Sequence, residues 1–358
     1  MVRIAVIPGD GIGPEVVAEA LPLLEWARNR GRQLEWEIFP HGADYFLSTG
    51  ETLSNEIFMR LRDNFDAILF GAVGDPRVPD GRHAEDILLR LRKDLRLRVN
   101  YRPCSPMLDI HVPLKGVAAA DIHMEIFREN TEGPYCLMGE STEYGATDFA
   151  IHTEAAVSCL LRAAFQRAKI LGAPLTMAHK ANVLKHGHGL WLRVFQKMQP
   201  EFPTVRSTAM HADALLCALV QRPWDFGVIA ADNFIGDLLS DLLAAFQGGM
   251  GLASSANLIV SDDPTFAGHP YRCTGLFEPV HGSAPDIAGK GIANPAGAIL
   301  SAALMFRHLG WTEEAQEVET SVKLALIAGA TTQDLGGTLT TGEMGQALRA
   351  GLQRELEN

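Results

Sequence analysis

Two aspartates in the second half of the chain have the spacing of a metal site. Asp237 and Asp241 lie four residues apart in NFIGDLLSDLLAAF, residues 233 to 246, which has the apolar periodicity of a helix. Four residues make about one helical turn, so both carboxylates leave the same helix face. Like charges at this spacing repel, and a divalent cation with oxygen ligands, Mg²⁺ or Mn²⁺, would relieve the repulsion. Two solvated acids near a helix start are the alternative.

Cationic and acid–base side chains occur in three further segments. Arg92, Arg102 and Arg128 carry guanidinium groups that match carboxylates bidentately, with surface solvation as the alternative for each. Tyr135 lies in RENTEGPY, and Lys180 follows an apolar strand in AHKANVLKHG. Both types need a pKa lowered by burial or by a nearby cation before they can work as acid and base near neutral pH. A core tyrosine with a tethered hydroxyl is the alternative for Tyr135.

A long loop near the end of the chain has the composition of a nucleotide site. The segment EPVHGSAPDIAGKGIANP, residues 278 to 295, is dense in Gly, Pro, Ser and Asn. Loops of this length inside compact domains are usually functional. His281 can stack on an adenine, backbone amides can meet phosphates, and Asp286 can accept from a ribose diol. A carboxylate there favours NAD over NADP because it repels a 2′-phosphate.

The early turn IPGDGIGPEV, residues 7 to 16, looks like a dinucleotide fingerprint but departs from it. Gly9 and Gly11 fill the first two glycine positions, whereas Pro14 stands at the sixth place, where the third glycine belongs. Asp10 also adds a negative charge where a pyrophosphate needs backbone N–H groups. The turn therefore argues against an ordinary Rossmann site.

Composition narrows the class of protein. With 358 residues and 47% hydrophobic content, the chain can bury the core of one large or two moderate domains. A net charge of -12 argues against a nucleic-acid partner, and the basic segment 88 to 102 favours a small anionic ligand. The five cysteines form no C-x-x-C pair, which is typical of free thiols in a reducing cytosol. No run reaches the roughly 18 apolar residues of a membrane span, so we expect a cytoplasmic protein.

Hydrophobic patterns alternate between the periods of strands and helices. In the first part of the chain we expect strands at RIAVI, LEWEIF and DAILFGAV and helices over about 14–28 and 54–63. Further on we expect a strand at HMEIFREN, a loop through STEYGATDF, a helix over about 153–171, strands at PLTMAHK and WDFGVIAADNF, and two helices after the glycine-rich loops. This order predicts a layered α/β fold with two domains.

The motifs also occur together in a known order. PGDGIGPE, E-x-x-LL-x-LRK-x-L-x-L-x-x-N-x-RP, REN-x-EGPY, HKANVL, ADNFIGDLLSD and EPVHGSAPDIAGKGIANP resemble the motifs of the isocitrate/isopropylmalate, or β-decarboxylating, dehydrogenase family. The resemblance covers essentially the whole chain. It implies an isopropylmalate dehydrogenase-like layered α/β fold in two domains, distinct from the Rossmann fold. Residues 1–98 plus 250–358 would form the large cofactor-binding domain, and residues 99–249 the small domain with substrate, metal and dimer-interface residues.

The resemblance also implies the chemistry, which is oxidation of a 2-hydroxy diacid by NAD followed by loss of the carboxyl group on C3. A divalent metal would polarise the ketone as it forms and stabilise the enolate left by CO₂. Lys180 would help remove the hydroxyl proton, and Tyr135 would protonate the enol carbon. Lys180 and Asp213 would reach across from the second subunit, so each active site would need a homodimer.

The remaining roles follow from the same resemblance. The three arginines, Arg92, Arg102 and Arg128, would hold the substrate carboxylates. The metal ligands would be Asp213, Asp237 and Asp241. Glu85 would lie near the nicotinamide, and the rest of the cofactor site would be His281, Gly282, Ser283, Ala284, Asp286 and Asn294.

The choice of substrate rests on the segment around residue 88. Leu88 and Leu89 stand where isopropylmalate dehydrogenases place the leucines that face the isopropyl group, whereas RENTEGPY and FGAVGDPRVPD are more similar to homoisocitrate, isocitrate and tartrate/D-malate enzymes. An apolar wall at Leu88, Leu89 and Val183 favours an alkyl group, because an unpaired polar group there costs several kcal/mol. A 3-substituted malate, with 3-isopropylmalate first, is the leading hypothesis; tartrate, D-malate or homoisocitrate is the alternative.

Two further questions remain open at this point. Arg90 lies within the specificity segment, where it could serve a third carboxylate or be solvated. A catalytically silent regulatory or ligand-binding relative is a hypothesis from another class. Such a relative is expected to lose catalytic groups, whereas Tyr135, Lys180 and the three aspartates are present here.

Overall fold

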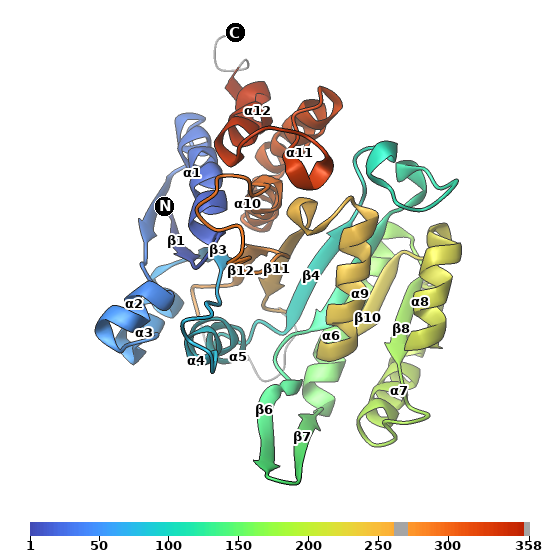
Figure 1. The fold of residues 1–358 in the computed structure, drawn as a ribbon. Helices are drawn as coiled ribbons and strands as arrows, with labels where there is room; N and C mark the ends of the chain where they lie inside the picture. Colours follow the sequence, from blue (N-terminus) through green and yellow to red (C-terminus); the bar gives the residue numbers. More distant parts are fainter. Residues whose placement is uncertain (261–270, 354–358) are drawn as a thin grey trace.

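A single mixed sheet runs through the whole molecule. The computed structural model describes residues 1–260 and 271–353 (Figure 1). Its ten-stranded sheet has the spatial order β2 (Leu34–Ile38), β1 (Val2–Gly9), β3 (Ala67–Ala72), β12 (Gly275–Pro279), β11 (Ser254–Leu258), β4 (Val99–Cys104), β5 (Met124–Glu129), β10 (Val228–Ala231), β8 (Leu175–His179) and β9 (Ser207–His211). Strand β11 is antiparallel to β12 and β4, and β4 is antiparallel to β5, while the outer strands pair in parallel.

The half of the sheet around β1 is covered on both faces. Ile4 and Val6 point into a core formed with α1 (Gly13–Asn29), α10 (Ala296–His308), α11 (Thr312–Ile327) and α12 (Thr341–Gln353). Ala5 and Ile7 alternate to the opposite face, as the period of a strand requires. There they pack with residues of α3 (Asn55–Asn64), the π-helical segment Glu85–Leu89 and α5 (Arg90–Asp94). This explains why β1 reads as a continuous apolar run.

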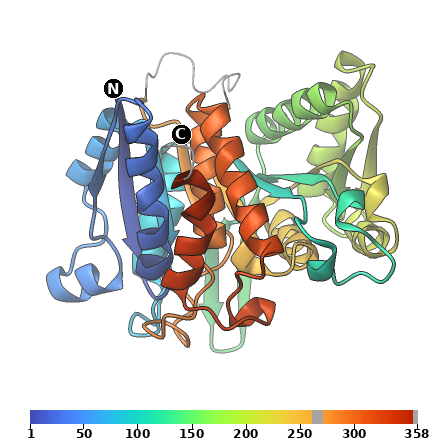
Figure 2. The ribbon, with the colours of Figure 1, turned by 90° about the horizontal axis from the view of Figure 1, so that it is seen from above.

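The other half of the sheet, around β10, is covered in the same way. Ala230 lies in a core with α6 (Glu154–Leu171) and α7 (Gly187–Met198), and Ile229 faces a core with α8 (Ala212–Gln221) and α9 (Asn233–Phe246). Figure 2 shows the helices from the two chain ends gathered over one half and the green and yellow helices of the middle over the other.

These cores bear on the predicted domain boundaries. The buried residues of one pair of cores come from positions up to Leu97 and from Leu252 onward, and those of the other pair from Val99 to Val260. This grouping is compatible with the predicted division at residues 98 and 250, which stays a prediction. Residues 261–270 and 354–358 of the predicted large domain lie outside the described residues.

Two expectations about secondary structure were wrong. The stretch STEYGATDF is part of an antiparallel hairpin, β6 (Gly133–Thr142) with β7 (Gly145–Ile151), that projects from the molecule in Figure 1. All of β7 is exposed, so the sequence has no apolar alternation to reveal a strand. Three helices, α10 to α12, follow the glycine-rich loops instead of two. Nearly every residue of α10 is buried, which removes the amphipathic period that marks a helix.

Two features bear on the environment of the protein. All five cysteines lie within the described ranges, and none of them forms a disulfide, in agreement with the expectation of thiols. In those ranges, no helix combines the length and apolarity needed to cross a bilayer.

Candidate active site

The aspartates of α9 lie at the centre of a charged cluster. The helix begins after Asp232, whose side chain accepts a hydrogen bond from the Ile235 amide at 2.8 Å. Farther along the helix, Asp237 accepts hydrogen bonds from the Tyr135 hydroxyl at 2.9 Å and from Arg128. The Arg102 guanidinium lies 3.6 Å from Asp237 and 3.5 Å from Asp241. The predicted aspartate pair and two of the predicted arginines are thus brought together.

Arg128 is buried at the end of β5 and is held there by α9. Its Nε and Nη2 atoms donate to Oδ1 of Asn233 at 2.9 and 2.7 Å, and its guanidinium carbon lies 5.1 Å from the ring centroid of Tyr135. The helix can approach this closely because residue 236 is glycine. A Cβ atom on Gly236 would lie 2.8 Å from the Arg128 side chain.

The third predicted arginine is joined to the same cluster through a buried polar chain. Arg92 donates to Glu278 at 2.7 Å, and Asn257 donates to the same carboxylate oxygen at 2.8 Å. Asn100 donates to Asn257 at 2.9 Å and accepts from Arg102 Nε at 2.7 Å. This chain crosses β12, β11 and β4 and fixes Arg92 relative to Arg102. We call Arg92, Arg102, Arg128, Asp237, Asp241 and Glu278 the arginine–carboxylate cluster.

Burial perturbs the ionisable groups of this cluster. Burial and the nearby Arg128 charge lower the pKa of Arg102 to about 10. Burial raises the pKa of Tyr135, opposite to the lowering expected from the sequence, because burial disfavours the charged phenolate. Burial and repulsion from Asp237 also raise the pKa of Asp241. Arg102 and Arg128 act in the opposite direction on the pKa of Asp241 but do not cancel burial and the Asp237 charge. Two adjacent carboxylates are hard oxygen donors, so they fit the predicted Mg²⁺ or Mn²⁺.

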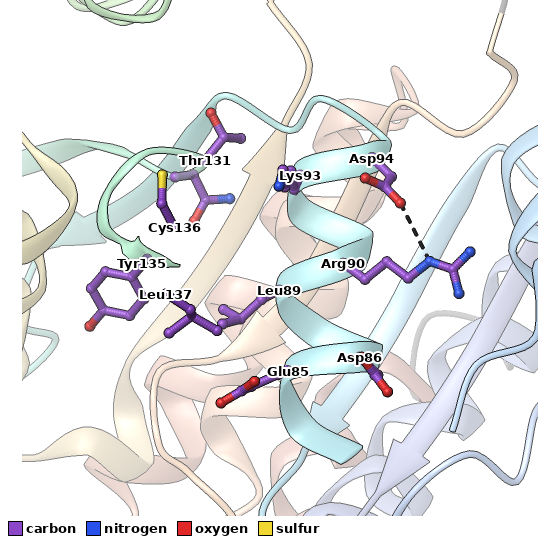
Figure 3. A pocket seen from close by; sticks show the side chains of 11 residues that line it. Glu85, Asp86, Leu89, Arg90, Lys93, Asp94, Thr131, Tyr135, Cys136 and Leu137 are labelled. Atoms are coloured by element: carbon purple, nitrogen blue, oxygen red, sulfur yellow. Dashed lines mark hydrogen bonds and ion pairs between the residues drawn. The ribbon is translucent and has the colours of Figure 1, made fainter. Parts of the chain in front are cut away.

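A pocket of about 300 Å³ opens beside Tyr135 (Figure 3). Leu89 and Leu137 extend toward each other at its Tyr135 side, with Glu85 below them in the view. Leu88, by contrast, packs partly against the core under the sheet. Of the two predicted wall leucines, Leu89 therefore lines this pocket.

Arg90 faces away from Tyr135 in the same view (Figure 3). Its guanidinium donates to the Leu53 carbonyl at 2.5 Å, lies 3.4 Å from Asp94 and covers the ring of Phe58. These contacts hold the guanidinium on the outer side of α5, while Arg90 also contributes to the lining of the pocket.

Lys180 and Asp213 pair with each other instead of joining the arginine–carboxylate cluster of their own chain. Lys180 Nζ lies 2.9 Å from Asp213 Oδ1, and this hydrogen bond lowers the pKa of Asp213. The Asp213 side chain is 68% exposed, and Val183 on the same loop as Lys180 is 64% exposed. The three residues thus present a surface-facing group.

The predicted cofactor loop lies against the early glycine turn. The Ile12 amide donates to the Ser283 carbonyl at 2.8 Å. Gly11 has φ +58°, and a Cβ atom there would lie 1.9 Å from the same carbonyl oxygen. Glycine is required at this contact because both the backbone conformation and the space exclude a side chain.

Within the loop, the predicted residues are not equally free to meet a ligand. His281 Nδ1 bonds the Gly282 carbonyl at 2.9 Å, while its buried Nε2 has no hydrogen-bond partner among the described residues. Burial lowers the pKa of His281, which favours the neutral ring suited to an adenine. Asp286 and Gly282 are exposed, and Ala284 is half-buried with φ +40°.

Asn294 has a structural task in addition to any contact with cofactor. Its amide nitrogen donates to Asp334 at 3.0 Å, and its oxygen accepts from the Ala296 amide at 3.0 Å. It therefore anchors the end of the loop to the start of α10.

Comparison with known proteins decides the family. A model described as isocitrate/isopropylmalate dehydrogenase matches residues 3–348. The chain is 43% identical to a 3-isopropylmalate dehydrogenase of Thermobifida fusca, over 90% of both chains, and 40% identical to that of Nocardia farcinica, over 97% of this chain and 99% of the other. The chain belongs to the isocitrate/isopropylmalate dehydrogenase family.

Solved structures agree with this membership. An isocitrate dehydrogenase from Methylococcus capsulatus superposes with a TM-score of 0.87 at 31% identity, covering 99% of this chain and all of the other. A β-decarboxylating dehydrogenase from Thermococcus kodakarensis gives 0.78 at 34% identity, covering 100% and 98%. This family member is an oxidoreductase of the β-decarboxylating type, and the predicted α/β fold distinct from the Rossmann fold is confirmed.

Two residues of the site were not predicted from the sequence. Asn233, which holds Arg128, continues the four-residue spacing of Asp237 and Asp241 along one helix face, so extending that pattern would have found it. Glu278 begins the loop motif but gave no sign of its partner, because Arg92 lies 186 residues away.

Proposed function

We propose that this family member catalyses the NAD- and divalent-metal-dependent oxidative decarboxylation of a 3-substituted malate, with 3-isopropylmalate as its substrate. The arginine–carboxylate cluster carries the proposal. Its three guanidinium groups balance its three carboxylates, so a divalent cation would leave a double positive charge. A dicarboxylate substrate would neutralise that charge, and guanidinium forks match its carboxylates in geometry.

The apolar side of the pocket supports an alkyl substituent on C3. Leu89 and Leu137 line the space beside Tyr135, where a hydroxyl or carboxylate without a partner would lose several kcal/mol of hydration. The relatives at 43% and 40% identity are named 3-isopropylmalate dehydrogenase, which favours the same substrate. Tartrate, D-malate and homoisocitrate remain the alternatives within this reaction class.

In this proposal Asp237 and Asp241, with Asp213 of the partner subunit, hold Mg²⁺ or Mn²⁺. When bound, the cation supplies Lewis-acid stabilisation of negative charge on the C2 oxygen. Lys180 accepts the proton of the C2 hydroxyl during oxidation. The Tyr135 hydroxyl, held by Asp237 at 2.9 Å in the unliganded protein, returns a proton to C3 after the carboxyl group leaves.

The cofactor site in this proposal is the loop from His281 to Asn294, with Glu85 near the nicotinamide. NAD, when bound, supplies the hydride acceptor. The unpartnered Nε2 of His281 supports an adenine contact, and the exposed Asp286 supports a ribose contact that disfavours NADP.

A homodimer completes each site in this proposal. Large apolar side chains are exposed on α9, where Phe234 and Leu238 are 52% and 51% exposed, and on the Lys180 loop at Val183. Such surfaces are typical of a protein interface. The pairing of half-buried Lys180 with exposed Asp213, away from the arginine–carboxylate cluster, supports their use by a neighbouring subunit. The free thiols favour a reducing cytoplasm as the compartment.

The experiment is steady-state NADH formation with Mn²⁺ across 3-isopropylmalate, D-malate, tartrate and homoisocitrate, repeated with NADP. Best turnover on an acid other than 3-isopropylmalate would overturn the substrate assignment, and a preference for NADP would overturn the cofactor. Lys180→Ala should abolish turnover, whereas Lys169→Ala, at an exposed lysine of α6, should not change it. Turnover that survives Lys180→Ala would remove that role. No turnover on any acid by the wild type would favour the silent regulatory relative.

A further inference from the structure

We propose that His188 is a positioning residue that ties the backbone of Lys180 to the start of α9. The inference rests on the proposed role of Lys180 in proton transfer. His188 lies in the first turn of α7 and is 1% exposed. Its Nδ1 accepts a hydrogen bond from the Lys180 amide at 2.8 Å, and its Nε2 lies 3.1 Å from Oδ2 of Asp232.

The hydrogen bonds fix which ring nitrogen carries the proton. An amide N–H can only donate, so Nδ1 must be the acceptor, and the ring proton is then on Nε2. Nε2–H donates to Asp232, which is 4% exposed and uses its other oxygen to cap α9. The three groups form a directed chain from the Lys180 amide through the imidazole to the α9 N-terminus.

Sheet pairing explains why Lys180 needs this partner. Strand β8 ends at His179, so the Lys180 amide is the first one beyond the strand. A partly buried amide without an acceptor destabilises the folded protein. His188 supplies the acceptor from eight residues away and thereby sets where the chain leaves the strand. From this point the Lys180 side chain reaches Asp213 in α8.

The hydrogen bonds of His188 also connect two groups that the proposed reaction needs. Asp232 caps the helix whose next turns carry Asp237 and Asp241. Lys180 lies at the other end of this series of hydrogen bonds and would serve the partner's site. His188 therefore fixes the position of Lys180, which serves the partner's site, relative to Asp237 and Asp241, which serve the site of its own subunit.

His152, His188 and Asp232 also have the spacing of a metal-binding group. The hydrogen bonds of these side chains favour a group that binds no metal ion. Both ring nitrogens of His188 are engaged, and His152 Nδ1 accepts from Trp191 Nε1 at 3.2 Å. The His152 ring also packs directly against Gly187, where a Cβ atom would lie 2.5 Å from it.

Three substitutions separate the two hydrogen bonds of His188. His188→Asn keeps an acceptor at the position of Nδ1 and loses the reach to Asp232. His188→Gln reverses this, because its longer amide reaches Asp232 but leaves the Lys180 amide without an acceptor. His188→Leu removes both. His186→Asn, at an exposed position of the same loop, is the matched control.

The kinetic result should follow the Lys180 hydrogen bond. We expect His188→Gln and His188→Leu to lower kcat on the order of 10²-fold with little change in KM, because misplacement of about 1 Å has that effect on chemistry. His188→Asn should retain most of kcat, and His186→Asn should retain all of it. Equal loss in the Asn and Gln variants, or loss in KM alone, would overturn the positioning role.

A second measurement does not depend on activity. Hydrogen exchange at the Lys180 amide should be slow in the wild type and in His188→Asn, and fast in His188→Gln and His188→Leu. Slow exchange in all four proteins would overturn the inference even if the enzyme acts on another acid. A transition metal bound stoichiometrically by the wild type and lost in His188→Leu would also overturn it. If Lys180→Ala loses activity but every His188 variant keeps it, the proposed function would be supported and the positioning role of His188 would be contradicted.

Discussion

Nε2 of His83 lies 2.9 Å from Oδ2 of Asp10, and both side chains are buried. The same carboxylate accepts from the amides of Ala43 at 2.5 Å and Gly74 at 2.8 Å. Asp10 thus joins the start of α2 (Ala43–Thr49), the loop after β3 and α4 (Arg82–Ala84), which leads into the segment with Glu85 and Leu89. Asp10 therefore holds neighbouring loops together. This structural role explains why the glycine turn carries a negative charge that would be unfavourable in a pyrophosphate-binding turn.

Replacing Asp10 by alanine should destabilise the protein. Two buried amides and one buried imidazole would lose their acceptor, and each such loss costs about 1–3 kcal/mol before relaxation. We expect the free energy of unfolding in urea to fall by about 3 kcal/mol. Asp44→Ala, which removes an exposed carboxylate nearby, should change it by less than about 0.5 kcal/mol. Equal effects of the two substitutions would show that the Asp10 contacts are not needed.

Gly11→Ala should separate the glycine turn from the cofactor loop. The added Cβ would lie 1.9 Å from the Ser283 carbonyl oxygen, and the alanine would have to adopt φ +58°. We expect KM for NAD to rise by about tenfold or more, equivalent to about 1.4 kcal/mol, because the loop must shift. Gly342→Ala is the control, since its nearest neighbour would be 3.8 Å away on Glu19. An unchanged KM for NAD in Gly11→Ala would argue that residues 281–294 do not bind the cofactor.

The raised pKa of Asp241 gives a pH dependence with a defined sign. A carboxyl group with a pKa above its ordinary value, about 3.9, favours the protonated form in the folded state. Its ionisation therefore lowers the stability of the metal-free protein as pH rises from the ordinary value through the raised one. Proton and cation compete for the same oxygens, so Mn²⁺ affinity should fall as pH falls through the raised pKa.

Asp241→Asn tests both consequences by calorimetry. Without metal, the variant should have a Tm above that of the wild type at pH 7, with the difference vanishing near pH 3. The gain should stay below about 1 kcal/mol, because the side chain is 42% exposed. Mn²⁺ should raise the Tm of the wild type and not that of the variant. Equal Mn²⁺ stabilisation of both proteins would place the metal elsewhere.

Shared active sites can be detected by mixing two inactive variants. Lys180→Ala and Tyr135→Phe should each be inactive as homodimers. In a mixed dimer, one site would combine the intact Tyr135 of one subunit with the intact Lys180 of the other. Random exchange of subunits in a two-fold dimer should therefore restore about a quarter of wild-type activity. Activity that stays at the level of the separate variants would place Tyr135 and Lys180 in the same subunit's site.

Local patterns in the sequence determined several of the helices and the groups they carry. Apolar residues recur with a helical period in α9, so the predicted bounds 233–246 match the helix and place Asp237 and Asp241 on one face. The predicted helix at about 153–171 agrees with α6 within one residue. Family motifs added the expected roles of Tyr135, Lys180 and the arginines, because those segments keep their order along the whole chain.

The tertiary structure decided which distant groups meet. Arg92 with Glu278, Ile12 with Ser283, and Asp10 with His83 are contacts between separate segments, and no local period encodes them. The order of strands in the sheet sets these contacts by bringing the ends of β1, β3 and β12 side by side. The exposed β6–β7 hairpin was missed for a related reason, since burial against the rest of the fold is what gives a strand its alternating pattern.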